Sequence, residues 1–102
     1  MPDFANPFSG NVERKMTFNE LIRAIRLNLA AEQEATNQYL AHADATDNEL
    51  AKAVLVDIAN EERVHAGEFQ RLLNILLDDE EHLLEDGADE VDEIAEDLGE
   101  EG

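Results

Sequence analysis

The sequence predicts an all-α protein, an antiparallel two-helix hairpin that dimerises into a four-helix bundle, with a short C-terminal helix and an acidic tail. Two stripes of inward positions, each with alternating steps of three and four residues, predict the two long helices. The chain has 102 residues and no cysteine. Because so small a core has no disulfides to stabilise it, we expect association with a second copy to complete it.

The first long helix is expected to start at Thr17, because Thr17 and Glu20 have the Ser/Thr-x-x-Glu spacing of a capping box. Neither Gly nor Pro interrupts its stripe, which consists of Ile22, Ile25, Leu29, Glu32, Thr36, Tyr39 and Ala43. Residues 1–16 contain both prolines and show no period. They are predicted to form an extended N-terminal arm.

The second helix is expected to start near Thr46, because Thr46 and Glu49 repeat the capping-box spacing. Its stripe consists of Ala51, Leu55, Ile58, Glu62, His65, Phe69, Leu72 and Leu76. Gly67 costs this helix about 1 kcal/mol relative to Ala, which tertiary packing can offset. The short connection makes the two helices antiparallel neighbours.

The third segment is strongly acidic. Asp78 or Asp79 is expected to cap a shorter helix that ends before Gly87, so that residues 17–87 form the helical hairpin domain and residues 88–102 an acidic, mobile tail. Residues 1–77 hold 12 acids and all 7 bases, whereas residues 78–102 hold 14 acids and no base. The negative charge therefore belongs mostly to the C-terminal part, where a solvated tail is the simpler explanation and attraction of metal cations is the alternative.

Composition also excludes several classes of partner. No basic stripe is present to meet phosphates, so nucleic-acid binding is not expected. The longest apolar runs fall far short of the roughly 20 residues that span a membrane. The first residues lack the basic and apolar regions of a signal peptide, so a cytoplasmic protein is expected.

Three polar residues interrupt the otherwise apolar stripes: Glu32 in the first helix, and Glu62 and His65 in the second. A carboxylate that faces a core is costly unless it is paired or bound to a metal. Glu62 and His65 lie nearly one turn apart on one helix face. Counted from the connection at Thr46, Glu32 and Glu62 lie about 21 and 24 Å along their helices. All three side chains are therefore expected to converge.

This set is half of a known kind of metal site. Di-iron carboxylate centres in four-helix bundles take one Glu from each of two helices and one Glu-x-x-His from each of the other two. The chain has one of each, so a homodimer would share the centre, with Glu62 able to bridge two irons. The carboxylate-rich, sulfur-free donors favour iron, although manganese stays open. The alternatives are a solvated Glu32 and a hydrogen-bonded core His65.

Other residues near this set have weaker claims. Tyr39 lies two turns from Glu32 on the same face, where it either donates a hydrogen bond to a ligand or serves as a core aromatic. Glu34 and Glu61 flank the ligands and point elsewhere. They either guide entering metal or belong to a solvated face.

Two segments of the chain are AEQEATNQY at residues 31–39 and NEERVH at residues 60–65. Through these segments the chain resembles encapsulated ferritins, the short ferritin-like proteins of encapsulin nanocompartments. The resemblance covers roughly residues 17–77. It implies a ferritin-like bundle with a ferroxidase centre of Glu32, Glu62 and His65 shared between two subunits. Ala31 and Gln38 differ from better-known members, which have an acidic residue and a Trp there.

The resemblance also implies partners and further roles. It places Tyr39 near the centre and Glu34 in a proposed iron-entrance site. It implies that homodimers assemble into a decameric ring, that an encapsulin shell protein is the partner, and that the location is inside an encapsulin nanocompartment in the cytoplasm.

The sequence therefore predicts a ferroxidase that oxidises ferrous iron for mineral storage, with iron bound between two subunits. A rubrerythrin-like di-iron peroxidase is the first alternative, although rubrerythrins usually add a cysteine-ligated iron domain. A non-enzymatic helical adaptor, indifferent to metal, is the second.

Overall fold

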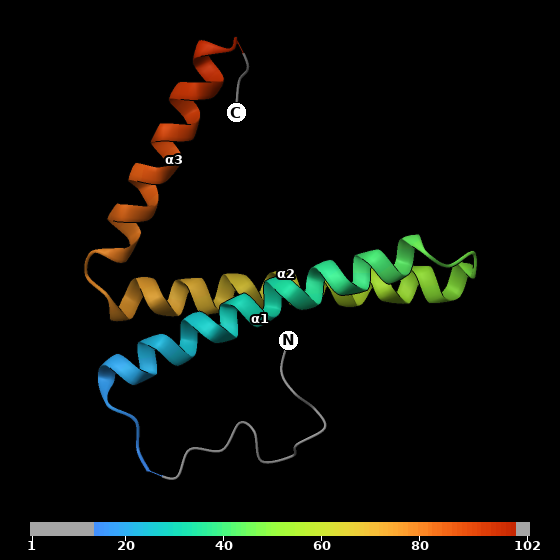
Figure 1. Cartoon of the computed structure of the whole chain (residues 1–102), viewed down its shortest axis with the longest axis horizontal. Helices are drawn as coiled ribbons and strands as arrows, with labels where there is room; N and C mark the ends of the chain where they lie inside the picture. The colour runs from blue at the N-terminus through green and yellow to red at the C-terminus, as the bar shows by residue number, and fades with distance from the viewer. Residues whose placement is uncertain (1–13, 100–102) are drawn as a thin grey trace. The chain divides into compact units, whose positions relative to one another are not determined.

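The computed structural model describes residues 14–99, which form three helices (Figure 1). These are α1 (Phe18–Asp44), α2 (Glu49–Leu76) and α3 (Glu80–Asp97). The described part of the chain contains no strand, and the predicted all-α hairpin fold is confirmed. Most of the expected N-terminal arm, residues 1–13, lies outside the described residues.

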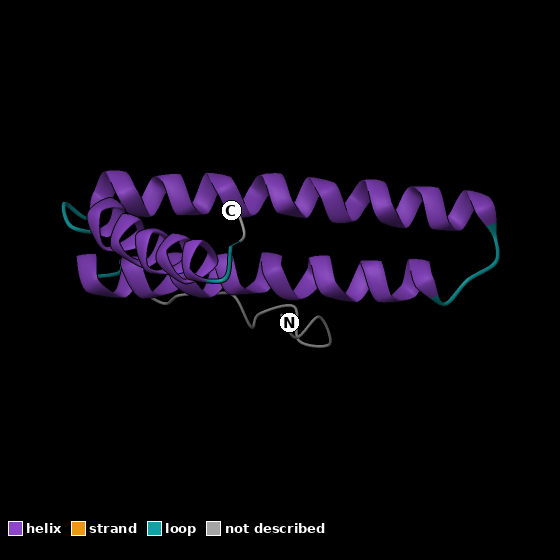
Figure 2. Ribbon diagram, turned by 90° about the horizontal axis from the view of Figure 1, so that it is seen from above, coloured by secondary structure: helices purple, strands orange, loops and turns teal. Residues whose placement is uncertain are grey.

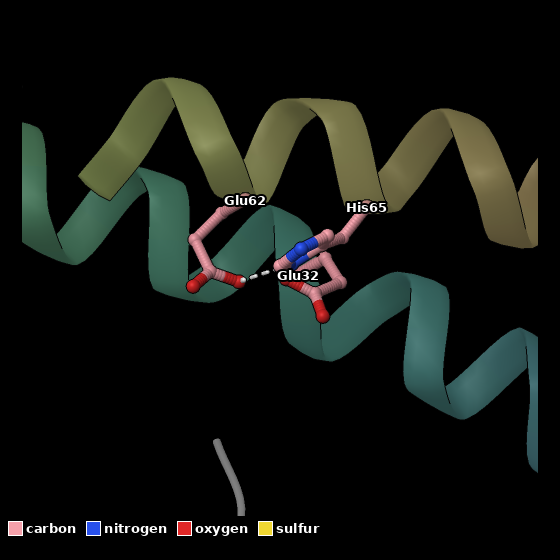
Figure 3. A group of neighbouring side chains, drawn as sticks. All are labelled: Glu32, Glu62 and His65. Atoms are coloured by element: carbon pink, nitrogen blue, oxygen red, sulfur yellow. Dashed lines mark ion pairs between the residues drawn. The ribbon is translucent and has the colours of Figure 1, made fainter. Parts of the chain in front are cut away.

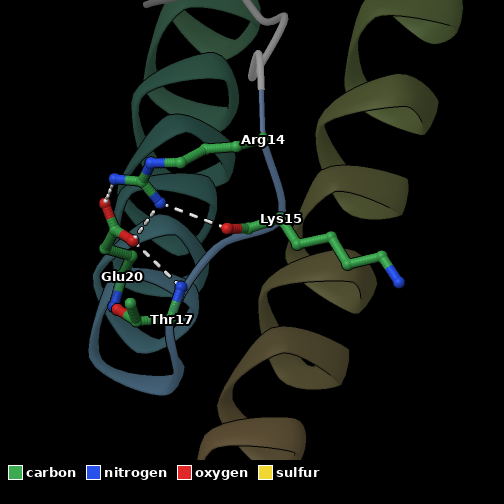
Figure 4. Close-up of polar contacts among 4 residues, drawn as sticks. All are labelled: Arg14, Lys15, Thr17 and Glu20. Carbon is green, nitrogen blue, oxygen red and sulfur yellow. Dashed lines mark hydrogen bonds and ion pairs between the residues drawn. The ribbon is translucent and has the colours of Figure 1, made fainter.

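The start of α1 is fixed by the predicted capping box (Figure 4). The backbone N–H of Glu20 donates to the Thr17 hydroxyl at 3.2 Å, and the Thr17 N–H donates to Glu20 Oε1 at 2.9 Å. Arg14 adds two hydrogen bonds of 2.8 Å to the Glu20 carboxylate. The segment before the helix is thereby tied to its first turn.

The start of α2 is close to the expected position but is capped by a different residue. The side chain of Asn48 accepts a hydrogen bond of 2.9 Å from the Ala51 N–H. The hydroxyl of Thr46 accepts one of 3.1 Å from the Asn48 N–H, which forms a local turn before the helix. Thr46 was therefore the wrong cap, because Asn48 is an equally good capping residue nearer the first helical turn.

Helices α1 and α2 lie side by side and antiparallel (Figures 1 and 2). The buried apolar residues between Phe18 and Arg71 are few and mostly small: Ile22, Ile25, Ala43, Ala59 and Ala66. Large apolar side chains such as Leu27, Leu50 and Val64 remain at least 66% exposed. A hairpin with so small a core leaves apolar surface for association with another chain.

The chain divides into two compact units that meet between Arg71 and Leu72, within α2. The second unit contains the end of α2 and all of α3. Its buried side chains are Leu73 and Glu80. Asp79 occupies the expected N-cap position of α3, but its side chain makes no capping hydrogen bond.

The expected end of the third helix before Gly87 was wrong, because α3 continues to Asp97. Residues 88–97, which we assigned to the tail, are therefore helical. A glycine inside a helix costs only about 1 kcal/mol, and most of its neighbours here are adequate helix formers. The helix is instead capped at Leu98 and followed by Gly99, whose φ of 76° lies in the left-handed region.

No helix in the described part of the chain is long and apolar enough to cross a membrane.

Candidate metal centre

Glu32, Glu62 and His65 lie together on one side of the hairpin (Figure 3). Glu32 comes from the middle of α1, and the other two come from the facing turns of α2. The three residues lie at the same height along the hairpin, as their distances from the connection predicted. Their spacing at steps of three and four residues places them on the facing sides of the two helices. In the described residues, they form the one group of three or more potential His, Cys, Asp or Glu ligands that converges.

The imidazole of His65 lies between the two carboxylates. Its Nδ1 is 3.7 Å from Glu32 Oε2 and 3.8 Å from Glu62 Oε2. The side chains of Glu32 and Glu62 are 19% and 21% exposed, whereas that of His65 is 48% exposed. The two carboxylates are therefore mostly covered, whereas the imidazole is open to the approach of a further group.

One carboxylate oxygen in this cluster has no hydrogen-bond partner. Glu32 Oε2 is buried and accepts no hydrogen bond. A buried carboxylate oxygen without a donor costs free energy, which a bound cation would offset. One ligand atom from each residue lies within 4.8 Å of the other two. Because metal–ligand bonds of about 2.1 Å place opposite ligands about 4.2 Å apart, a small inward movement lets the three atoms share one ion.

The residues therefore fit a metal ion. Two carboxylates and one imidazole suit iron, manganese or zinc, whereas calcium prefers oxygen ligands alone. One chain supplies three ligand atoms, fewer than the four to six that such ions take. The exposed side of His65 is where the missing ligands can enter.

The other candidate residues lie outside this group. Tyr39 is half-buried, and no hydrogen bond or ion pair joins it to the three residues in the described structure. Glu34 and Glu61 are exposed, in keeping with either a solvated face or an entrance role. Their proposed contributions remain predictions.

Sequence reasoning did not assign a role to Thr36, which supports the turn carrying Glu32. Its hydroxyl donates a hydrogen bond of 2.8 Å to the Glu32 carbonyl oxygen. A threonine on a helix often donates a hydrogen bond to the carbonyl oxygen four residues earlier. The four-residue spacing of Glu32 and Thr36 could therefore have predicted this bond. This bond fixes the Thr36 side chain beside the ligand-bearing turn.

Comparison with known proteins relates this geometry to a family. The family model described as Rubrerythrin matches residues 9–97. The chain is 57% identical over 68 residues to the encapsulin nanocompartment cargo protein EncC of Myxococcus xanthus, covering 67% of this chain and 52% of that protein. It is 36% identical over 89 residues to the ferritin-like-encapsulin shell fusion protein of Pyrococcus furiosus, covering 87% of this chain and 26% of that protein. The chain thus spans about half the length of the first relative and about a quarter of the second.

A solved structure matches the whole fold. The crystal structure of the encapsulated ferritin domain from Pyrococcus furiosus superimposes with a TM-score of 0.82 at 35% sequence identity. The match covers 95% of this chain and 96% of that domain.

Proposed function

The chain belongs to the encapsulin-associated ferritin-like proteins, with a domain of the rubrerythrin family, and on this premise we propose that it is a ferroxidase acting at a di-iron site between two subunits. The observation that carries the proposal is the convergence of Glu32, Glu62 and His65 around a buried carboxylate oxygen that accepts no hydrogen bond. Fold alone would not support an activity, because ferritin-like bundles serve several chemistries.

The half-site explains why two copies are needed. Two chains that face each other across the open side of His65 contribute four carboxylates and two imidazoles. The four negative charges of the carboxylates balance the charge of two ferrous ions. Dimerisation and completion of the site would therefore be one event, in which Glu32, Glu62 and His65 of each chain would hold the iron.

Ferrous iron is the substrate of this reaction. Two Fe(II) ions give up one electron each, and these electrons with two protons convert one oxygen molecule to hydrogen peroxide, or one hydrogen peroxide to two water molecules. The carboxylates favour this oxidation, because anionic oxygen ligands stabilise the higher charge of the ferric product.

The names of the relatives support a place for this activity. One is a nanocompartment cargo protein, and another joins a ferritin-like domain to an encapsulin shell. We infer that this chain works with an encapsulin shell protein and delivers ferric iron for mineral storage inside the compartment, as a homodimer or a ring of homodimers.

The test measures iron oxidation in single variants. Glu62→Ala should slow the near-ultraviolet absorbance rise after Fe(II) addition by at least about 100-fold, the upper end of what loss of a group supporting the ligands costs. Glu68→Ala, an exposed carboxylate on the same helix, is the matched control and should retain the native rate. Unchanged oxidation in Glu32→Ala and Glu62→Ala would rule the proposal out.

A rubrerythrin-like peroxidase is the second candidate, because the matching family model carries that name. The same three residues would hold the metal, but peroxide would be the favoured oxidant and a reducing partner would return the iron to the ferrous state. Comparing oxygen with peroxide, while following iron as mineral or as soluble ion, separates the two. Accumulation of ferric mineral favours the ferroxidase, and sustained peroxide consumption with soluble iron favours the peroxidase.

A further inference from the structure

Thr36 is a further polar residue on the inward stripe of α1, and the proposed metal site does not account for it. It lies one turn after Glu32 and is half-buried. Threonine is a poorer helix former than alanine or leucine, because its branched side chain loses rotamer freedom in a helix. An apolar residue at this position would suit both the helix and the stripe better, unless the hydroxyl group is needed.

The hydroxyl of Thr36 is bonded to the turn that carries a metal-centre glutamate. It donates a hydrogen bond of 2.8 Å to the carbonyl oxygen of Glu32. In an α-helix the backbone N–H of residue 36 donates to the same oxygen, which therefore accepts two hydrogen bonds. The second bond selects one of the two χ1 rotamers that threonine adopts in helices. The side chain of Thr36 and the backbone of Glu32 are thus held together.

The carboxylate of Glu32 depends strongly on its backbone for orientation. Ligating carboxylates are usually oriented by hydrogen bonds from neighbouring groups. In the described part of the chain, Glu32 Oε2 is buried and accepts no hydrogen bond. Its distance of 3.7 Å from His65 Nδ1 is also longer than a hydrogen bond. The position of this oxygen is therefore set by the side-chain rotamer and by the turn of α1 that carries it.

The geometry of the centre makes that turn important. The ligand atoms of Glu32, Glu62 and His65 lie within 4.8 Å of one another. Binding sites need their groups held to within about 0.5 Å of the productive geometry. A threonine bonded to the carbonyl four residues earlier restrains its turn and often bends the helix slightly. Loss of this bond therefore changes how well the three atoms can share one ion.

We propose that Thr36 is a positioning residue of the metal centre, whose hydroxyl holds the Glu32 carboxylate in place by fixing the turn of α1 that bears it. The inference rests on the proposed function in so far as Glu32 is a metal ligand, but it does not depend on the oxidation of iron. Thr36 and Glu32 both belong to α1, so one helix contains the whole interaction.

Two pairs of full-length proteins test the hydroxyl alone. Native protein and Thr36→Val differ by a hydroxyl on a branched side chain, and Thr36→Ser and Thr36→Ala differ by a hydroxyl on a smaller one. Co(II), whose visible absorption reports its ligands, is titrated in place of Fe(II) so that binding is measured without oxidation. The member without the hydroxyl should bind Co(II) roughly 3- to 10-fold more weakly. This is less than the 10- to 100-fold cost of losing a group that touches a ligand side chain, because Thr36 acts through the backbone.

Stability separates positioning from a merely structural role. Metal-free Thr36→Val should unfold at the same urea concentration as native protein or a higher one, because it places an apolar group on the half-buried stripe. A merely structural hydroxyl would instead lower the urea midpoint and leave Co(II) affinity unchanged. Asn37→Val introduces the same side chain at the exposed next position, and this matched control should bind Co(II) as native protein does.

Iron oxidation, measured on the same proteins, distinguishes failure of this inference from failure of the ferroxidase proposal. If Co(II) binding is lost in Glu32→Ala and native protein oxidises no Fe(II), the ferroxidase proposal fails and the role of Thr36 stands. Equal Co(II) affinity within either pair would overturn the role of Thr36, whatever the rate of iron oxidation. Absence of Co(II) binding in native protein would overturn both.

Discussion

The hairpin and α3 have the same helical periodicity but use it in opposite ways. The stripes of α1 and α2 are interrupted by Glu32, Glu62 and His65, and their positions are buried or half-buried except at His65 and Leu72. The apolar stripe of α3 has no charged interruption, and its large side chains are exposed: Leu84, Val91, Ile94 and Leu98. Periodicity thus predicts a helix in both cases. A charged residue inside a covered stripe indicates a site, whereas the unbroken apolar stripe of α3 carries no such signal.

The largest expected contrast between the two regions is in stability. Ile25 is 4% exposed on α1, whereas Val91 is 64% exposed on α3. Ile25→Ala should lower the free energy of unfolding by about 2–5 kcal/mol, because it removes buried methyl groups and leaves a cavity. Val91→Ala should change it by less than about 0.5 kcal/mol in dilute, metal-free protein. Urea unfolding followed by circular dichroism measures both.

One outcome would break this comparison. A Val91→Ala effect as large as that of Ile25→Ala in dilute protein would mean that the stripe is covered within one chain, and the contrast would fail.

The second prediction concerns the interruption of the hairpin stripe. Glu32→Leu should raise the free energy of unfolding of the metal-free protein by about 1–3 kcal/mol, because it removes a buried carboxylate oxygen that accepts no hydrogen bond. The same substitution should abolish iron oxidation, a trade of stability against function. Glu68→Leu, at an exposed position, is the control and should stay within about 0.5 kcal/mol. A destabilised Glu32→Leu would show that the carboxylate already has adequate partners without metal.

Much of the hairpin could be predicted because it depends on short-range sequence patterns and on the number of residues between two positions. Thr17 and Glu20 specify the first cap through their spacing, and the level of Glu32 and Glu62 follows from counting residues from the connection. The second cap was misplaced, since both Thr46 and Asn48 can accept a helix N–H and only the turn geometry decides between them.

The features that could not be predicted depend on tertiary context. The continuation of α3 through Gly87 reflects a small local cost that its neighbours offset. Whether Tyr39 bonds to a ligand depends on side-chain rotamers that spacing does not specify. A pocket lined by Leu29, Gln33, Arg63, Ala66, Gly67 and Gln70 could not be found from the stripes alone, because only Leu29 of these residues lies on a stripe.

The third prediction separates two glycines of the second unit. A Cβ at Gly87 would meet nothing within 4 Å, so Gly87→Ala should stabilise α3 by roughly 0.5–1 kcal/mol. Gly99 has a φ of 76°, so Gly99→Ala should instead loosen the helix end through backbone strain. Amide hydrogen exchange along α3 measures both effects. Faster exchange in Gly87→Ala would mean that its glycine is needed for close packing.

The smallest expected effect on stability concerns the start of α1. Side-chain hydrogen bonds anchor this helix start, whereas the N-cap side chain of α3 makes none. The hydrogen-bonded Arg14 guanidinium, with further bonds to Thr17, lowers the pKa of Glu20 from 4.5 to about 2. A lowered pKa in the folded state means that the ionised carboxylate stabilises the fold above the ordinary pKa and loses this effect as pH falls from about 4.5 to 2. The stability difference between native protein and Glu20→Gln should therefore shrink across this window.

Asp79→Asn is the matched change in α3, where the side chain makes no capping bond, and it should show a smaller pH dependence. If the Glu20→Gln difference stayed constant down to pH 2, the anchor would not depend on an ionised Glu20.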